Sequence, residues 1–309
     1  MQRQIQEQAQ ARASELTLGP VLFNWEPERW RDFYFGIADE APVTTVYLGE
    51  AICFKRAPLF RDHVDAVAER LAAAGKTVVR STLSEVMSAQ ERSLVAEVCA
   101  EPAVMVEAND GSALLHLRGR PHHVGPFINV YNERTMAVLA RGGACAICLP
   151  PEMPAEAIAA LCIEAATLGV TIETQVFGRL SLALSARCYH ARAHDRNKDS
   201  CQFICKQDPD GLTLRTLEDQ PFLVINGIQT MSYDYLNLIG ELADLQRIGV
   251  RRFRLSPHSC DMVAVAATFR DVLDERIDAG EATQRLDALG IAAPFSNGFY
   301  HGKAGHLWN

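Results

Sequence analysis

Long apolar runs are missing from this 309-residue sequence. No segment approaches the roughly 18 consecutive apolar residues that a membrane-spanning helix needs, so we expect no span. An excess of positive charge is missing as well: 30 lysines and arginines stand against 38 aspartates and glutamates, which gives a formal net charge of −8. That balance argues against a protein that follows a nucleic-acid backbone.

A secretory signal is also lacking. Residues 1–15 are polar and have no apolar centre, so we interpret them as a polar N-terminal extension of a cytoplasmic protein. In such a protein, nine cysteines are better explained as free thiols or metal ligands than as a disulfide framework.

Eight short β-rich segments alternate with amphipathic helical segments along the chain. The predicted strands are 16–23, 44–50, 77–83, 103–110, 122–132, 143–150, 171–178 and 251–257, and the clearest predicted helices are 59–76, 84–100, 153–168 and 232–248. Regular alternation implies parallel strands covered by helices, and eight such units fit a (β/α)8 TIM-like barrel. We therefore predict an α/β protein whose single barrel domain covers residues 16–309.

The alternation breaks at residues 179–250, which predicts an insertion after the seventh strand. Two β-like runs in it, LTLRT and FLVING, follow a DPDG turn and predict a small hairpin outside the barrel. The insertion also carries cysteines at positions 188, 201 and 205. A segment this long with little regular structure needs a cross-link to become ordered.

The cysteines of the insertion lie among charged residues and histidines, where a hydrophobic core has little use for them. A thiolate site for zinc or for a cubane iron–sulfur cluster needs four donors, and the insertion offers three. A fourth, Cys53, follows the second predicted strand and would lie on the same face of a barrel. We predict one metal centre held by Cys53, Cys188, Cys201 and Cys205.

Two alternatives stay open for these cysteines. They could be unligated surface thiols, or three of them could bind zinc together with His190 or His194.

The other cysteines are not expected to bind a metal. Cys145 and Cys148 lie on one predicted strand, where residues three apart point to opposite faces, so we expect no shared ion there. The remaining cysteines are expected to be core residues at Cys99 and Cys162, with no assignment for Cys260.

Polar residues near the ends of the predicted strands could line a substrate cavity at the barrel mouth. The candidates for substrate binding are Arg80, Glu107, Asn129, Tyr131, Glu173 and Arg254. The two arginines suit an anionic substrate, because guanidinium binds carboxylate through paired hydrogen bonds. Alternatively, Arg80 neutralises one of the two glutamates, and we assign no catalytic residue.

Five segments carry a family resemblance: VYLGEAICFKR (46–56), FGRLSLALSARCYHARAHDRNKDSCQFIC (177–205), VINGIQTMS (224–232), RLSP (254–257) and SNGFY (296–300). Together they resemble the collagenase-like peptidase family U32, and within it the members that act in ubiquinone biosynthesis. The resemblance extends over nearly the whole chain after about residue 16, and the cysteine spacing together with YLGEA, SARC and NGIQTMS is its specific part.

The resemblance implies a [4Fe-4S] cluster on Cys53, Cys188, Cys201 and Cys205. It also implies a heterodimer with a homologous, UbiU-like subunit and a shared role in oxygen-independent ring hydroxylation under anaerobic conditions. Two other roles stay open: prephenate-dependent hydroxylation of RNA bases, as in other relatives, and a non-catalytic scaffold that carries the cluster. Neither an HExxH nor a GxSxG motif occurs, so we expect no peptidase activity.

Overall fold

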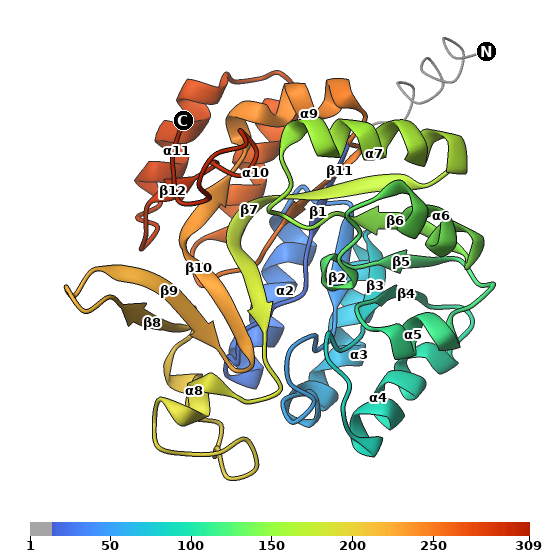
Figure 1. Cartoon of the computed structure of the whole chain (residues 1–309), viewed down its shortest axis with the longest axis vertical. Coiled ribbons are helices and arrows are strands. Elements are labelled where there is room, and N and C mark those ends of the chain that lie inside the picture. The colour runs from blue at the N-terminus through green and yellow to red at the C-terminus, as the bar shows by residue number, and fades with distance from the viewer. Residues whose placement is uncertain (1–13) are drawn as a thin grey trace.

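A closed barrel of parallel strands forms the centre of the protein (Figure 1). The computed structural model describes residues 14–309, so most of the predicted extension at 1–15 lies outside the described residues. The barrel strands pair in the order β11-β1-β2-β3-β4-β5-β6-β7, and β7 pairs back to β11. They are β1 (Glu15–Leu18), β2 (Thr45–Leu48), β3 (Thr77–Ser81), β4 (Met105–Ala108), β5 (His122–Val124), β6 (Ala144–Cys148), β7 (Thr171–Leu184) and β11 (Arg252–Leu255). Each overlaps a predicted strand, so the predicted (β/α)8 barrel is confirmed.

Helices cover the outside of the barrel. They are α2 (Pro27–Glu40), α3 (Ala57–Ala73), α4 (Ala89–Ala100), α5 (Gly111–His116), α6 (Glu133–Arg141), α7 (Ala155–Leu168), α9 (Leu242–Ile248), α10 (Met262–Leu273) and α11 (Ala279–Ala288). Local sequence fixes several of their starts. Before α4, for example, Ser88 and Glu91 form a reciprocal capping box, which satisfies backbone N–H groups that have no partner within the helix. None of the helices in the described part of the chain is long and apolar enough to cross a membrane.

The helix predicted at 232–248 is wrong over its first part. Residues Gln229–Asn237 form strand β10, and helical structure begins only at Ile239. The strand wins because β7 continues past the barrel wall and offers a free edge, with which β10 pairs antiparallel. Tertiary pairing has overridden a local pattern that suits a helix.

The predicted hairpin is confirmed as β8 (Leu212–Arg215) and β9 (Pro221–Asn226), which pair antiparallel. It is joined to the barrel through β10, which pairs with both β9 and β7. The cysteine-bearing segment lies between β7 and β8 and contains α8 (Tyr189–Arg192) and a 3-10 turn, Ile204–Gln207. In Figure 1 this segment lies beside the C-terminal end of β7.

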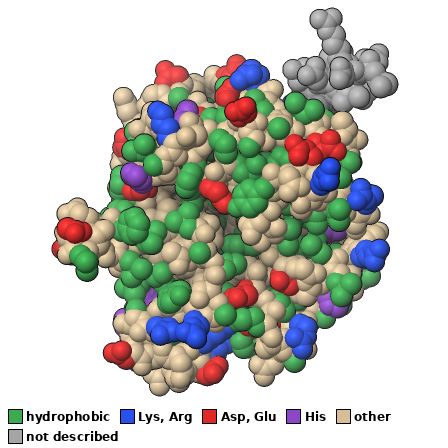
Figure 2. Space-filling model, viewed as in Figure 1, with side chains coloured by type: hydrophobic (Ala, Val, Ile, Leu, Met, Phe, Trp, Pro, Cys, Tyr) green, Lys and Arg blue, Asp and Glu red, His purple; other side chains and the backbone are tan. Residues whose placement is uncertain are grey.

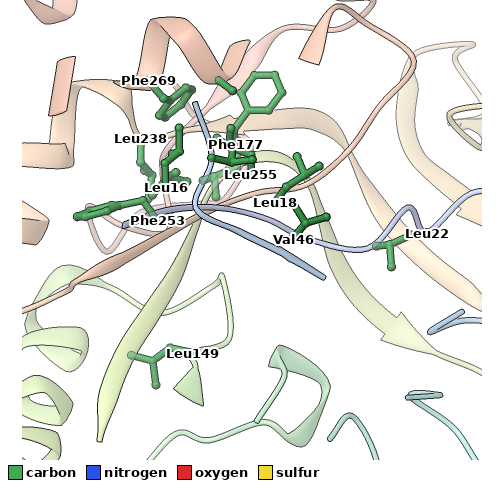
Figure 3. Packing of buried hydrophobic residues seen from close by; sticks show 14 of the residues in the cluster. Leu16, Leu18, Leu22, Val46, Leu149, Phe177, Leu238, Phe253, Leu255 and Phe269 are labelled. Atoms are coloured by element: carbon green, nitrogen blue, oxygen red, sulfur yellow. The ribbon is translucent and has the colours of Figure 1, made fainter. Parts of the chain in front are cut away.

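The two faces of the barrel strands carry different side chains. Leu16, Leu18, Phe253 and Leu255 point outward and pack with helix residues such as Phe269, as Figure 3 shows. Full burial of such a side chain contributes about 1.5–3 kcal/mol. The residues that alternate with them are polar and point into the barrel, which places charged groups below its mouth.

Candidate functional site

Four cysteine thiols from two distant segments line one small cavity. Cys53 comes from the loop after β2, whereas Cys188, Cys201 and Cys205 come from the segment between β7 and β8. The structure therefore brings together the four cysteines that the sequence singled out. We call the surroundings of this cavity the thiol site.

Local hydrogen bonds shape the two segments that carry the thiols. The Glu50 carboxylate accepts the backbone N–H groups of Ile52 at 2.8 Å and Cys53 at 2.9 Å, which folds the loop back after β2. The sulfur of Cys188 caps α8 by accepting the N–H of Ala191 at 3.4 Å. The thiol positions are thus set by backbone structure on both sides of the cavity.

Two further N–H groups approach the sulfur atoms. Asn24 Nδ2 lies 3.4 Å from Cys205 Sγ, and Lys55 Nζ lies 3.8 Å from Cys201 Sγ. The same ammonium group donates to the carbonyl of Lys198 at 2.8 Å, so it links the Cys53 loop to the insertion. Hydrogen bonds to sulfur stabilise thiolates and raise the reduction potential of iron–sulfur clusters.

Arg56 lines the same cavity as the four thiols and is only 1% exposed. It donates to the Leu22 carbonyl at 2.8 Å and to Asn226 Oδ1 at 3.0 Å. No carboxylate among residues 14–309 lies within ion-pair distance of it, and its Nε has no partner. Burial opposes the charge, but attraction to Cys205, Glu50 and Cys53 outweighs burial and raises the pKa of Arg56.

Burying a cation without an ion pair costs several kcal/mol, and an anionic group next to Arg56 would lower that cost. Gly227 leaves space for this guanidinium. Its φ of +62° favours glycine, and a Cβ there would lie 2.9 Å from Arg56 Nη2. The NGIQ sequence thus makes room for the guanidinium.

The separation of the sulfur atoms distinguishes between possible metal groups. No three of the four described thiols have all their sulfur atoms within 4.8 Å of one another. Tetrahedral zinc with Zn–S bonds of about 2.3 Å would require sulfur atoms about 3.8 Å apart. In a cubane cluster each thiolate binds a different iron, which holds the sulfur atoms farther apart. As placed, the thiols do not form a tetrahedral zinc site, whereas four thiols beside a buried cation are a donor set that would suit an anionic four-iron cluster.

A larger cavity, of about 350 Å³, opens at the barrel mouth. Of the predicted substrate residues it is lined by Glu107, Asn129, Tyr131 and Arg254. Glu173 lies deeper, where its carboxylate accepts hydrogen bonds from Thr17 at 2.6 Å and Tyr47 at 2.8 Å.

The charge of Arg254 is already neutralised within the barrel. Its Nη2 lies 2.6 Å from Glu107 Oε1 and 2.5 Å from Glu173 Oε2. Burial would raise the pKa of Glu173, but the two arginines Arg254 and Arg252 outweigh burial and lower it to about 2. This buried network orders the floor of the cavity, and it leaves Arg254 little charge for a substrate.

Arg80 does not reach the mouth. It lies on the outward face of β3, in a separate cavity of about 700 Å³ that Arg61 and Asp65 of α3 also line. It pairs with neither Glu107 nor Glu173, which take Arg254 instead.

Asn129 and Tyr131 lie at the mouth, but the predicted strand at 122–132 does not extend to them. Strand β5 ends at Val124, because Gly125 and Pro126 follow it and proline cannot donate to a ladder. Asn129 then takes a left-handed turn with φ of +59°. Tyr131 is half exposed and donates to the Glu152 carboxylate at the rim of the cavity.

The sequence analysis missed Arg179, which lines the mouth and is 4% exposed. Its Nη1 donates to the carbonyls of Ser232, at 3.2 Å, and Tyr233, and its guanidinium stacks on Tyr235 at 4.6 Å. Within the described chain no carboxylate pairs with it, and its Nε has no partner. Arg179 therefore presents an unneutralised charge to the cavity. Its position after the expected end of the seventh strand hid it from the sequence analysis.

A serine, a histidine and an aspartate lie close together near this cavity, but not in a catalytic arrangement. Ser259 Oγ donates to the Asp210 carboxylate, so it does not contact the imidazole as a nucleophile would. His258 Nε2 accepts the backbone N–H of Arg179 at 3.0 Å, and the ring is fully buried. His258 thus helps to hold the backbone of Arg179 in place.

Comparison with known proteins gives one family match. The family model described as Peptidase family U32 matches residues 32–309. Solved structures that resemble the chain include a Thermotoga maritima DAHP synthase (12% identity, 92% of this chain and 72% of that chain, TM-score 0.44). Another is the Bacillus cereus spore cortex-lytic enzyme SleL, with 8% identity over 86% of this chain and 75% of that chain and a TM-score of 0.43. These distant likenesses carry no argument about function.

Proposed function

Because this chain belongs to peptidase family U32, we propose that it is a UbiV-like iron–sulfur protein of ubiquinone biosynthesis. In this proposal it carries a [4Fe-4S] cluster on Cys53, Cys188, Cys201 and Cys205 and acts with a UbiU-like partner in oxygen-independent ring hydroxylation. The observation that carries the proposal is the convergence of four thiols on one cavity beside a buried, unpaired guanidinium.

A bound cluster with four thiolate ligands would supply one-electron transfer. The chain's own residues prepare the site for it. Arg56 offsets negative charge from below, while Asn24 and Lys55 donate to two of the sulfur atoms. Other basic side chains gather on the surface near α8, as Figure 2 shows, and they lower the cost of placing an anion there.

The barrel mouth is the proposed substrate cavity. Arg179 provides the charge for an anionic group of the substrate, and the aromatic side chains of Phe127 and Tyr131 line the wall against which a ring could pack. Leu22 connects the two sites, since it lines the mouth and its carbonyl accepts the hydrogen bond from Arg56. In this proposal the mouth binds and orients the ring, and Leu22 links the mouth to the thiol site.

Proteolysis is not supported by the side chains present. The sequence lacks HExxH and GxSxG motifs, and the group of Ser259, His258 and Asp210 lacks a serine–imidazole hydrogen bond. The net charge of −8 argues against RNA as the substrate.

Anaerobic purification followed by iron and sulfide analysis tests the cluster. We expect about four irons per chain and a broad absorption band near roughly 400 nm. Cys53→Ser should lose most of the iron, whereas the matched control Cys99→Ser, on α4 in the core, should keep it. A colourless protein, or a Cys53→Ser variant with full iron content, would refute the proposed centre.

A second experiment separates redox work from scaffolding. In Cys201→Ala the partner should still bind while ring hydroxylation stops. If the heterodimer falls apart instead, the cluster serves to hold the interface, and the proposed redox role is wrong.

A further inference from the structure

A second group of possible metal ligands lies next to the thiol site and contains no cysteine. The donor atoms of His190, His194 and Asp208 all lie within 4.8 Å of one another. They form the one such group among residues 14–309. Neither histidine joins a cysteine in such a group; both lie near an aspartate.

The fold brings these three residues together from the two ends of the cysteine-bearing segment. His190 lies on α8, and His194 follows one turn later, with its ring 5.9 Å from that of His190 and nearly parallel to it. Asp208 follows the 3-10 turn that contains Cys205, and its Oδ2 lies 2.9 Å from His190 Nε2. Two ligands bound to one zinc ion at about 2.1 Å in tetrahedral geometry lie about 3.4 Å apart, so these two atoms would separate by about half an ångström to bind an ion in place of their hydrogen bond.

Two of the imidazole nitrogens are buried and have no hydrogen-bond partner. These are His190 Nδ1, on a side chain that is 1% exposed, and His194 Nε2. Buried polar atoms are normally satisfied, and an unsatisfied one costs about 1–3 kcal/mol. A hydrogen bond between His190 and Asp208 leaves His194 Nε2 without a partner, and a bound ion would supply one. An ion bound through His190 Nε2 would leave His190 Nδ1 as it is, so the argument depends on His194.

We propose that His190, His194 and Asp208 bind a divalent transition-metal ion of the zinc class. Two imidazoles and one carboxylate are a ligand set that such ions favour, and three protein ligands leave a position for water or another donor. The ion would link α8, directly after Cys188, to the chain directly after Cys205. It would therefore hold the two ends of the cysteine-bearing segment at a fixed distance.

The charges around the site are compatible with a cation. Arg56 is close enough to affect His190 and opposes a positive ion. Asp208 contributes one negative charge at the site itself, and the anionic group expected at the thiol site offsets Arg56. The proposal adds a second metal to the proposed function and does not depend on the reaction.

The test uses the full chain, purified anaerobically with its iron, and Zn²⁺ as the probe. Competition with a chromophoric chelator measures the affinity, and X-ray absorption at the zinc edge identifies the ligand atoms. We expect one zinc per chain, nitrogen and oxygen ligands at roughly 2.0–2.2 Å, and no loss of iron. His194→Gln and Asp208→Asn should each weaken zinc binding at least about tenfold, whereas His116→Gln, an exposed residue on α5, should not.

Three outcomes would overturn the proposal. They are no zinc retained at about 100 μM, sulfur ligands at roughly 2.3 Å, or affinities unchanged in both variants. Iron is counted in the same samples, so loss of the iron centre is seen separately from failure to bind zinc. His194 is six residues along the chain from the nearest cysteine, whereas Asp208 is three, so His194→Gln remains informative if Asp208→Asn cannot be loaded with iron.

Discussion

The charge of Arg56 gives the sharpest quantitative prediction. The residue is fully buried, touches the cavity of the four thiols, and has no carboxylate partner in the described chain. Replacing it by glutamine keeps an N–H donor for the neighbouring oxygen atoms but removes the charge. If a four-iron cluster is bound there, its reduced form carries one more negative charge than its oxidised form. Removing the cation should therefore make reduction harder.

The size of the shift follows from Coulomb's law. With an effective dielectric constant of about 20 and a separation of roughly 7 Å, one charge contributes about 2.4 kcal/mol. One tenfold change in a one-electron equilibrium corresponds to about 59 mV and 1.4 kcal/mol, so the potential should fall by about 100 mV. Arg56→Lys keeps the charge and should retain most of the potential.

Potentiometric titration of the cluster absorption, under anaerobic conditions, measures this shift. The matched control is Arg192→Met, which removes an exposed charge from the same insertion. Solvent and salt screen that charge, so its shift should stay below about 30 mV. A potential for Arg56→Gln within about 30 mV of the unmodified protein would refute the idea that this buried cation compensates an anionic cluster.

Three further predictions concern stability and the mouth. Gly227→Ala should lower the free energy of unfolding by about 2–3 kcal/mol in urea denaturation, because the added Cβ contacts Arg56 and also strains a left-handed φ. The control Gly290→Ala has a φ of +66° and open space around it, so it should lower the free energy of unfolding by only about 1 kcal/mol. Equal losses in the two variants would contradict the predicted contact. The lowered pKa of Glu173 stabilises the fold above about pH 4.5, and this contribution, about 3 kcal/mol, should be lost as the pH falls toward about 2. In Glu173→Gln, the free energy of unfolding should therefore differ less between pH 5 and pH 3 than it does in the unmodified protein. The same difference in both proteins would contradict this role of Glu173. Arg179→Gln should weaken the affinity for a simple aromatic carboxylate such as benzoate about tenfold or more, as measured by calorimetry. Arg80→Gln should leave this affinity unchanged, because Arg80 lines a separate cavity. Equal effects of the two variants would place the ligand elsewhere.

The way in which the barrel strands pair explains why the sequence analysis misplaced some of the site residues. The two-residue period puts Arg80 and Ser81 on opposite faces of β3, but it does not say which face lines the barrel. Pairing with β4 turns Ser81 inward, where it donates to Glu107 at 2.7 Å, and turns Arg80 outward toward the helices. Arg179 was missed for a related reason, since nothing local shows that β7 continues beyond the barrel wall to pair with β10.

The sequence by itself determined the eight barrel strands, the hairpin in the insertion and the choice of four cysteines as a group. Hydrophobic periodicity, turn residues and cysteine spacing are local properties, and they survive any packing that buries the apolar faces. Only the tertiary structure decided that Arg254 pairs with two glutamates while Arg179 and Arg56 have no ion-pair partner among residues 14–309, and that His190 and His194 meet Asp208. Whether a charge finds a partner depends on strand register and on loops that meet in space, and neither is encoded within a single segment.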